Sequence, residues 1–483
     1  MKAVTAGIST VLLSLGLSAF SPLLAATIVI QNNDGPGEGF NETDSPPNGN
    51  QVGNNPGANL GEMRVNVFNA AAQRWGQLLN SAITITIAAE FNDLFCSQNS
   101  AVLGQAAATG TAANFGAGAA NVAYHIALAE SLAGSNLNGG STEITATFNS
   151  AVDSGNVNCL GGGGFYYGLD GNAPDGTTPL FVVVLHELAH GLGFSQLADV
   201  GPGGTGAFTG TGGFPDPFSR NLHDLETAKS WDTMTNGERL ASAINDPDLV
   251  WEGSQVTAQR TAFLDPAPEV DINAPPGIVG THPANLGEEP TIVLPMGGVT
   301  ADVVDGDALV ADPCADTSGA MSGRIVLYDL PAGCSAVFPA FLAEFSGAVG
   351  VIIANTSAGG LPDMSGQITN QDVTIPYVGV MQQVGADLRA NIGSANATIG
   401  ESDTVLSGEN QGMLRMFAPS PFVMGSSVSH WASEARPDLL MESSRGDLGF
   451  NQVDLTLPAM NDIGWSVNID LGEIFFMHGF EDP

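Results

Sequence analysis

Regular spacing of apolar residues divides the first part of the chain into strands and helices. Apolar side chains recur every three or four positions over 60–79, which predicts an amphipathic helix packed on a partner. Alternation of β-branched and polar residues predicts half-buried strands at 83–87 and 143–148, and a β-branched apolar run predicts a strand at 27–30. The mixture of both periodicities indicates an α+β fold.

A second helix is predicted to be apolar on every side. The threonines at 177–178 can cap it, Pro179 suits its first turn, and the run 181–185 is uniformly apolar. Gly191 and Gly193 are expected to end it, because glycine adopts a left-handed conformation without strain. We therefore expect a buried helix.

Prolines and glycines crowd the segment 266–290 and predict a domain boundary there. Beyond it, strand-like runs at 324–328 and 349–354 enclose a predicted helix at 336–345. This second unit is expected to end near Gly400. Sixty-two glycines among 483 residues favour long ordered loops and β structure over a helical bundle.

The charge balance restricts the partners. Fifty Asp and Glu against twelve Lys and Arg give a net charge of −38 at pH 7. Such a surface repels phosphate backbones and anionic headgroups, so nucleic acid is excluded as a partner and anionic membranes are disfavoured. Asp302, Asp305 and Asp307 form a candidate Ca²⁺ site, although their spacing matches no calcium-binding loop.

The N-terminus has the layout of a secretory signal. Lys2, an apolar stretch at 11–17 and the small residues Ala25 and Ala26 predict a signal peptide over 1–26, with the mature chain beginning near Thr27. No later apolar run reaches the roughly 18 residues needed to cross a bilayer, so no membrane span is expected. We expect a secreted monomer.

Four cysteines are present in a chain predicted to enter an oxidising compartment. That setting favours two disulfides over metal ligation, and the positions suggest pairing of Cys96 with Cys159 and of Cys314 with Cys334. No CxxC spacing competes with the histidines for a metal.

The strongest chemical signal is the motif His186-Glu187-Leu188-Ala189-His190, in a chain with only seven histidines. Residues four apart lie on one face of a helix, about 5–6 Å apart at Cβ, so both imidazoles can reach one zinc ion. Glu187 then remains free to take a proton from zinc-bound water and pass it to a leaving amine. The motif predicts a zinc hydrolase.

A catalytic zinc site needs a third protein ligand. Gly193 follows His190 as in the metzincin pattern HExxHxxGxxH, but the position of its third histidine holds Gln196, a poor zinc ligand. Either the site is crippled or a distant residue completes it. His430 and His223 are the candidates, and His125 is interpreted as structural.

The sequences GSSVSHW at 425–431 and LLM at 439–441 resemble the leishmanolysin-type metzincins. The resemblance implies that His430 is the third zinc ligand, and that Met441 lies in the methionine turn beneath the metal. It also implies that the strand at 143–148 borders the cleft, where an extended peptide would add as a further strand.

Other blocks, at 34–40, 71–76 and 461–465, resemble secreted bacterial proteins that join this catalytic domain to a protease-associated domain. The segment that contains GRIVL at 323–327 and GAVGVIIAN at 347–355 resembles the protease-associated domain inserted in those proteins. The resemblance implies a metzincin-like catalytic domain, with a mixed twisted sheet and an active-site helix, interrupted by an α/β domain. The expected divisions are catalytic 27–264, inserted 265–400, catalytic 401–470 and a tail over 471–483.

Together, these expectations predict a secreted zinc endopeptidase that hydrolyses protein or peptide substrates. The alternative is a catalytically weak zinc-containing protein that uses a protease scaffold for binding or adhesion. Association with the cell surface through the aromatic tail is a further possibility. A protease assay with and without a chelator separates the endopeptidase from the binding or adhesion protein.

Overall fold

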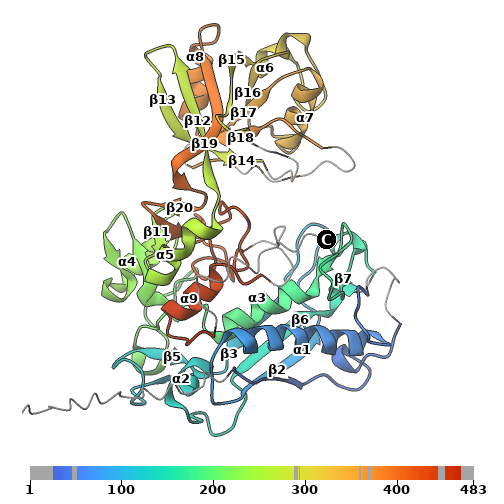
Figure 1. The fold of residues 1–483 in the computed structure, drawn as a ribbon, viewed down its shortest axis with the longest axis vertical. Helices are drawn as coiled ribbons and strands as arrows, with labels where there is room; N and C mark the ends of the chain where they lie inside the picture. Colours follow the sequence, from blue (N-terminus) through green and yellow to red (C-terminus); the bar gives the residue numbers. More distant parts are fainter. Residues whose placement is uncertain are drawn as a thin grey trace, which may run out of the picture.

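The computed structural model describes residues 25–45, 52–153, 155–287, 292, 294–357, 360–362, 364, 366, 372–443 and 452–468. Helices and strands form two lobes, shown one above the other in Figure 1. Strands β12 (Pro266–Ala274) and β19 (Asn396–Leu406) pair antiparallel and connect the lobes (Figure 1). Residues 1–24 of the predicted signal peptide and the whole predicted tail lie outside the described residues.

The first sheet of the lower lobe has the order β1-β2-β6-β3. The first three strands are parallel and β3 is antiparallel to β6, so β6 is an interior strand and β3 forms an edge. The expectation that the strand at 143–148 borders the cleft is therefore wrong, because β3 covers that side. The strands are β1 (Ile28–Asn32), β2 (Ile85–Asn92), β3 (Gly104–Ala108) and β6 (Ile144–Asn149).

Helices α1 and α3 pack against each other beside this sheet. The predicted helix at 60–79 is confirmed as α1, and the Asn59 side chain caps its N-terminus by accepting the Glu62 N–H. Trp75 is fully buried and donates its indole N–H to the Leu185 carbonyl at 3.0 Å, which ties α1 to α3. The helices are α1 (Leu60–Leu78), α2 (Ile126–Ala133) and α3 (Leu180–Leu192). Two short strand pairs accompany them: β4 (Thr111–Ala113) pairs with β5 (Ala123–His125), and β7 (Phe165–Tyr166) pairs with β8 (Thr178–Pro179).

A second sheet of the lower lobe combines chain segments that precede the upper lobe in the sequence with segments that follow it. Its order is β10-β9-β11-β21-β20, and the pairing of β11 with β21 joins residues before 266 to residues after 406. One hydrophobic core likewise contains Leu249 and Trp251 together with Leu414 and Trp465. The elements are β9 (Leu222–Asp224), β10 (Lys229–Ser230), β11 (Leu249–Trp251), β20 (Glu409–Asn410), β21 (Met413–Arg415), α4 (Asn236–Ser242), α5 (Ser254–Phe263) and α9 (Thr456–Asp462).

The upper lobe is built on an eight-stranded sheet of order β13-β12-β19-β15-β16-β17-β18-β14. Two hydrophobic clusters belong to this lobe. The predicted strands at 324–328 and 349–354 and the helix at 336–345 are confirmed as β16, β17 and α7. The elements are β13 (Gly280–Pro283), β14 (Asn285–Leu286), β15 (Val299–Asp305), β16 (Ile325–Asp329), β17 (Gly350–Ala354), β18 (Tyr377–Val380), α6 (Gly306–Leu309), α7 (Val337–Phe345) and α8 (Gln382–Ala390).

The proline-rich segment 266–290 contains strands where the sequence predicted a boundary. Strand β12 begins at Pro266 and lies between β13 and β19. Its pairing with β19 shifts register between Pro266 and Pro268, and such an irregularity accommodates residues that lack an N–H. Strand β19 also continues to Leu406, past the end expected near Gly400.

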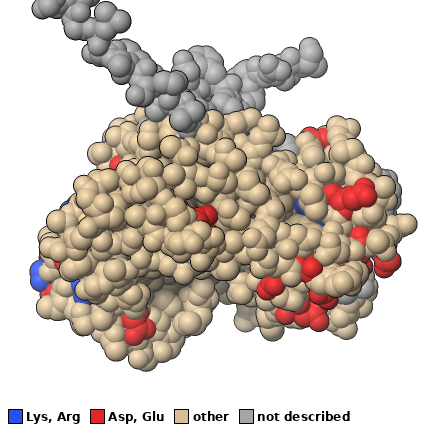
Figure 2. Space-filling model, turned by 90° about the horizontal axis from the view of Figure 1, so that it is seen from below, with Lys and Arg blue, Asp and Glu red and all other residues tan. Residues whose placement is uncertain are grey.

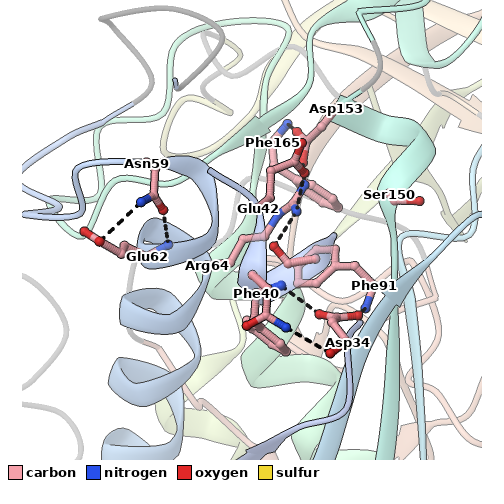
Figure 3. A network of polar contacts seen from close by, with 12 residues as sticks. Asp34, Phe40, Glu42, Asn59, Glu62, Arg64, Phe91, Ser150, Asp153 and Phe165 are labelled. Carbon is pink, nitrogen blue, oxygen red and sulfur yellow. Dashed lines mark hydrogen bonds and ion pairs between the residues drawn. The ribbon is translucent and has the colours of Figure 1, made fainter. Parts of the chain in front are cut away.

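A buried ion-pair network anchors α1 to the loops around it (Figure 3). Arg64 contacts Glu42 at 3.1 Å and Asp153 at 2.9 Å, and its guanidinium lies 4.3 Å from the centre of the Phe91 ring. The side chains of Arg64 and Asp153 are 2% and 5% exposed. Asp34 extends the network by accepting the backbone N–H groups of Phe40 and Phe91 (Figure 3).

Replacing Arg64 with leucine is expected to lower the free energy of unfolding by about 3–5 kcal/mol, because Asp153 loses its cation while buried. Chemical denaturation followed by tryptophan fluorescence measures the change. Arg220→Leu is the matched control, since its pair with Asp232 is partly exposed, at 45% and 25%, and contributes under about 1 kcal/mol. Equal losses for both variants would contradict the buried network.

Candidate metal centre

Helix α3 carries His186, Glu187 and His190 and ends at Leu192. Gly193 adopts φ +120°, and its N–H bonds back to the carbonyls of Ala189 and His190. The prediction that Gly193 ends the helix is confirmed, because this conformation strains any residue with a Cβ.

Two details of the helix ends differ from the prediction. Pro179 occupies the N-cap position without a side-chain cap, and Thr178 belongs to β8, so the threonines do not cap the helix. Gly191 lies inside the helix and does not help to end it. A Cβ at Gly191 would lie 2.4 Å from Cγ2 of Ile144, so glycine is required there for close packing of α3 on β6.

His430 reaches the same place from a loop far along the chain. Its backbone carbonyl accepts the Phe417 N–H at 2.9 Å, and Val428 donates its N–H to the Phe417 carbonyl at 2.8 Å. Val428 has φ +75°, a conformation that costs a β-branched residue about 1–3 kcal/mol. Phe417 therefore holds a strained turn that aims His430 at α3.

The three Nε2 atoms of His186, His190 and His430 form a nearly equilateral triangle, with each pair 3.2 Å apart. Two nitrogens bound to one zinc ion at about 2.0–2.1 Å with tetrahedral geometry lie about 3.3 Å apart. The observed spacing therefore fits a zinc tripod. Among the described residues, these three form the one group of three or more His, Cys, Asp or Glu side chains arranged to hold a metal.

The opposite ring nitrogens fix the tautomer of each histidine. Nδ1 of His186 bonds to the Leu440 carbonyl at 2.6 Å, that of His190 to the Phe194 carbonyl at 2.7 Å, and that of His430 to the Ser426 carbonyl at 2.8 Å. A carbonyl only accepts, so each Nδ1 carries the proton and each Nε2 presents a lone pair. Three converging lone pairs repel one another unless a cation lies among them.

Burial keeps these imidazoles neutral. It lowers the pKa of His186 to about 4 and, with the neighbouring His186, lowers the pKa of His190 to about 3. Burial and the two other imidazoles lower the pKa of His430 well below its ordinary value. Neutral imidazole is the form that ligates a metal, so the donor set fits zinc chemically as well as geometrically.

Glu187 lies beside the triad and is 8% exposed. Burial raises the pKa of its carboxyl to about 8, while a hydrogen bond from the Ala106 backbone N–H lowers it. A Cβ at Gly104 would lie 3.0 Å from Cγ of Glu187, so strand β3 approaches this carboxyl closely. The Glu187 carboxyl therefore lies next to the edge of the sheet.

Met441 is fully buried in the core of the lower lobe. Its carbonyl accepts the Trp431 N–H at 2.8 Å, while the carbonyl of the preceding Leu440 accepts His186 Nδ1. The segment 440–441 therefore links the residue after His430 to the ring of His186.

A cleft of about 1200 Å³ contains the three histidines and Glu187. It is lined by strand β3, by helix α3 at His186, Glu187 and His190, and by the loops around His430 and Glu442. The edge strand β3 was not predicted from the sequence.

The remaining histidines lie outside the triad or outside the described residues. His125 is 2% exposed, lines the cleft and lies 3.0 Å from Ser195 Oγ through its Nε2. His223 pairs with Glu252 at 3.1 Å, and His282 lies in strand β13. His478 is not among the described residues. Sequence reasoning missed the place of His125 in the cleft, because no local spacing relates it to α3.

Gln196 occupies the place of the third ligand in the short pattern and lines the cleft. Its side-chain oxygen accepts the Ala198 backbone N–H, so it forms a turn beyond the helix. His430 takes the third corner of the triangle.

The candidate calcium residues do not converge. Asp302 pairs with Arg324, whereas Asp305 and Asp307 both pair with Arg389, at 3.3 and 2.9 Å. Arginines supply the positive charge that these carboxylates need. Both predicted disulfides form, between Cys96 and Cys159 and between Cys314 and Cys334.

Comparison with protein-family models identifies one region of the chain. Residues 299–388 match the PA domain. This stretch extends from β15 into α8 of the upper lobe, so the PA domain lies where an insertion was predicted. No curated protein matches the chain.

Several solved structures match part of the chain. They include BSAP, a zinc aminopeptidase from Bacillus subtilis, at 19% identity over 31% of this chain and 35% of that one, with a TM-score of 0.22. An aminopeptidase from Aneurinibacillus sp. strain AM-1 is 20% identical over 31% and 38%, with a TM-score of 0.22. The subtilisin-like protease Apa1 from Pseudoalteromonas sp. AS-11 is 16% identical over 32% and 35%, with a TM-score of 0.22. The chain spans little more than a third of each.

No helix in the described part of the chain combines the length and the apolar character needed to cross a membrane.

Proposed function

We propose that the protein is a secreted zinc-dependent endopeptidase of metzincin type. Its catalytic unit would comprise 27–264 and 401–470, interrupted by an insertion at 265–400 that contains the PA domain. His186, His190 and His430 would hold the zinc ion and Glu187 would be the general base. Met441 would be the methionine of the turn beneath the metal.

One observation carries this proposal: three neutral imidazole nitrogens form a 3.2 Å triangle beside a buried carboxyl in a large cleft. A purely structural role does not explain it, because the three lone pairs face one another without a proton between them. Burying a glutamate next to them without a chemical use would also be costly.

A bound zinc ion would supply Lewis acidity, which polarises a carbonyl and makes a water molecule more acidic. The Glu187 carboxylate would take up the proton from the attacking water and deliver it to the nitrogen of the leaving amine. Burial suits Glu187 to this task, since it strengthens the affinity of the carboxylate for a proton. Strand β3 offers backbone N–H and C=O groups at a sheet edge, where an extended peptide can bind as an added strand.

Export is proposed from the signal-like N-terminus and from the two disulfides, which form and persist in oxidising compartments. Protein and peptide substrates fit the size of the cleft, and a monomer is proposed.

Metal removal tests the proposal. The protein as produced is expected to contain one zinc ion per chain by mass spectrometry and to cleave casein. A chelator should abolish cleavage, and added zinc should restore it. Zinc binding without cleavage would instead favour the binding or adhesion protein on a protease scaffold, and absence of zinc from the triad would overturn both.

A further inference from the structure

Glu442 is a buried carboxyl that the proposed reaction does not use. It is 5% exposed, so more than nine-tenths of the side chain is buried, and it lines the same cleft as the histidine triad. Its Oε1 accepts the Leu439 backbone N–H at 2.9 Å. No described residue donates a hydrogen bond to the second oxygen, although a carboxylate accepts up to about four.

The described charged groups that act on Glu442 are acidic. Glu434, Asp438 and Asp454 each act with burial to raise the pKa of Glu442 well above its ordinary value, burial being the largest cause. Glu434 is engaged with Arg415 at 3.2 Å, and Asp454 accepts the Leu440 N–H. No described residue therefore places a cation next to Glu442.

The rest of the cleft is equally poor in positive charge. Its described lining includes the carboxyls of Glu187 and Glu442 and contains neither lysine nor arginine. The chain as a whole has a net charge of −38, and acidic side chains outnumber basic ones on the face shown in Figure 2. A cleft bordered by one sign of charge concentrates ligands of the opposite sign.

We propose that Glu442 lines a side-chain subsite that selects a basic residue, lysine or arginine, next to the cleaved bond. The inference rests on the proposed peptidase function and assigns its substrate class. A guanidinium or ammonium group entering the cleft would supply a positive charge that no described residue places beside Glu442. It would also donate a charge-assisted hydrogen bond, stronger than a neutral one, to the carboxyl oxygen that accepts none from the described residues.

A structural role for Glu442 makes a different prediction. The bond from Leu439 to Oε1 spans the residues around Met441 and could serve only to shape that turn. Loss of the turn would weaken the hydrolysis of all peptides to a similar degree, whereas loss of a selective subsite would weaken only that of basic ones.

Matched peptides separate the two roles. Peptides that differ only in arginine against citrulline, its neutral isostere, are placed at each position flanking the cleaved bond. At one position the wild-type protein should prefer arginine by about 10- to 100-fold in kcat/KM, the range expected for a hydrogen bond to a charged group. Glu442→Gln should abolish this preference and leave the citrulline peptide within about twofold of wild type.

Two controls accompany the experiment. Glu401→Gln makes the same chemical change at an exposed position of β19 and should keep the preference. Glu442→Asp retains the charge and should keep part of it. Equal kcat/KM values for arginine and citrulline peptides in the wild type would overturn the inference, as would a parallel fall for both in Glu442→Gln.

Measuring peptide binding tests the basic-residue subsite without relying on turnover or on the folding of the Glu442 variants. The full chain carrying Glu187→Ala should bind the arginine peptide about 10- to 100-fold more tightly than the citrulline peptide by calorimetry. Equal affinities would reject the basic subsite. If the wild-type protein hydrolyses no peptide while this difference in affinity persists, the peptidase function fails and the basic-residue subsite stands.

Discussion

Replacing Glu187 with alanine is expected to lower kcat on a peptide substrate by about 10²- to 10⁴-fold, the range typical for loss of a general acid–base group. The zinc content should stay at one per chain, because Glu187 is not a corner of the histidine triangle. Stability should not fall, since the substitution removes a carboxyl that burial penalises. Steady-state kinetics, metal analysis and thermal melting measure the three quantities.

Glu187→Gln is the matched control for shape. It preserves the size of the side chain and an oxygen that can accept the Ala106 N–H, but it cannot take up a proton, so it should be as inactive as the alanine variant. Wild-type turnover in the glutamine variant would remove Glu187 from the proposed mechanism and leave the metal site intact. Loss of zinc in either variant would show that Glu187 supports the ligands instead.

Local patterns predicted the parts of the site that depend on one element. The apolar run that forms α3 and the four-residue spacing of His186 and His190 are properties of a single helix, so the sequence alone places both imidazoles on one face. Gly193 was predictable for the same reason, because the conformation that ends a helix is a local requirement.

Contacts between distant segments were not predictable from spacing. His430 lies 244 residues beyond His186, with the whole upper lobe between them, and it was identified through a resemblance. Strand β3 was missed because its sequence, GQAAA, has none of the β-branched or aromatic residues that mark strands. Gly104, which has no side chain, lets this strand pass within contact distance of Glu187.

Gly191 and the segment 266–290 show how tertiary context overrides local preference. Glycine usually weakens a helix interior, but here the close approach of Ile144 leaves no space for a larger residue. Prolines usually mark loops, yet Pro266 begins β12, and the register of its pairing with β19 shifts between Pro266 and Pro268. Missing N–H groups are tolerated at such positions. In both cases the deciding contact comes from another element.

Replacing His430 with alanine is expected to weaken zinc binding by more than about 100-fold. Loss of a residue that only hydrogen-bonds to a metal ligand already costs about 10- to 100-fold in affinity, and here a direct ligand is lost. Two imidazoles from α3 would remain, and the cleft would lose one corner of the 3.2 Å triangle. Casein cleavage should disappear at zinc concentrations that saturate the wild type. Titration with a competing chromogenic chelator measures the affinity.

The matched control is His223→Ala, because His223 was the other candidate for the third ligand. The structure pairs its Nδ1 with Glu252 at 3.1 Å, in a strand outside the triad, so zinc affinity and turnover should remain at wild-type values. The opposite pattern, with zinc lost on removal of His223 and retained on removal of His430, would exclude the proposed tripod. The position of the ligand thus decides whether the strained turn at Val428 serves the metal.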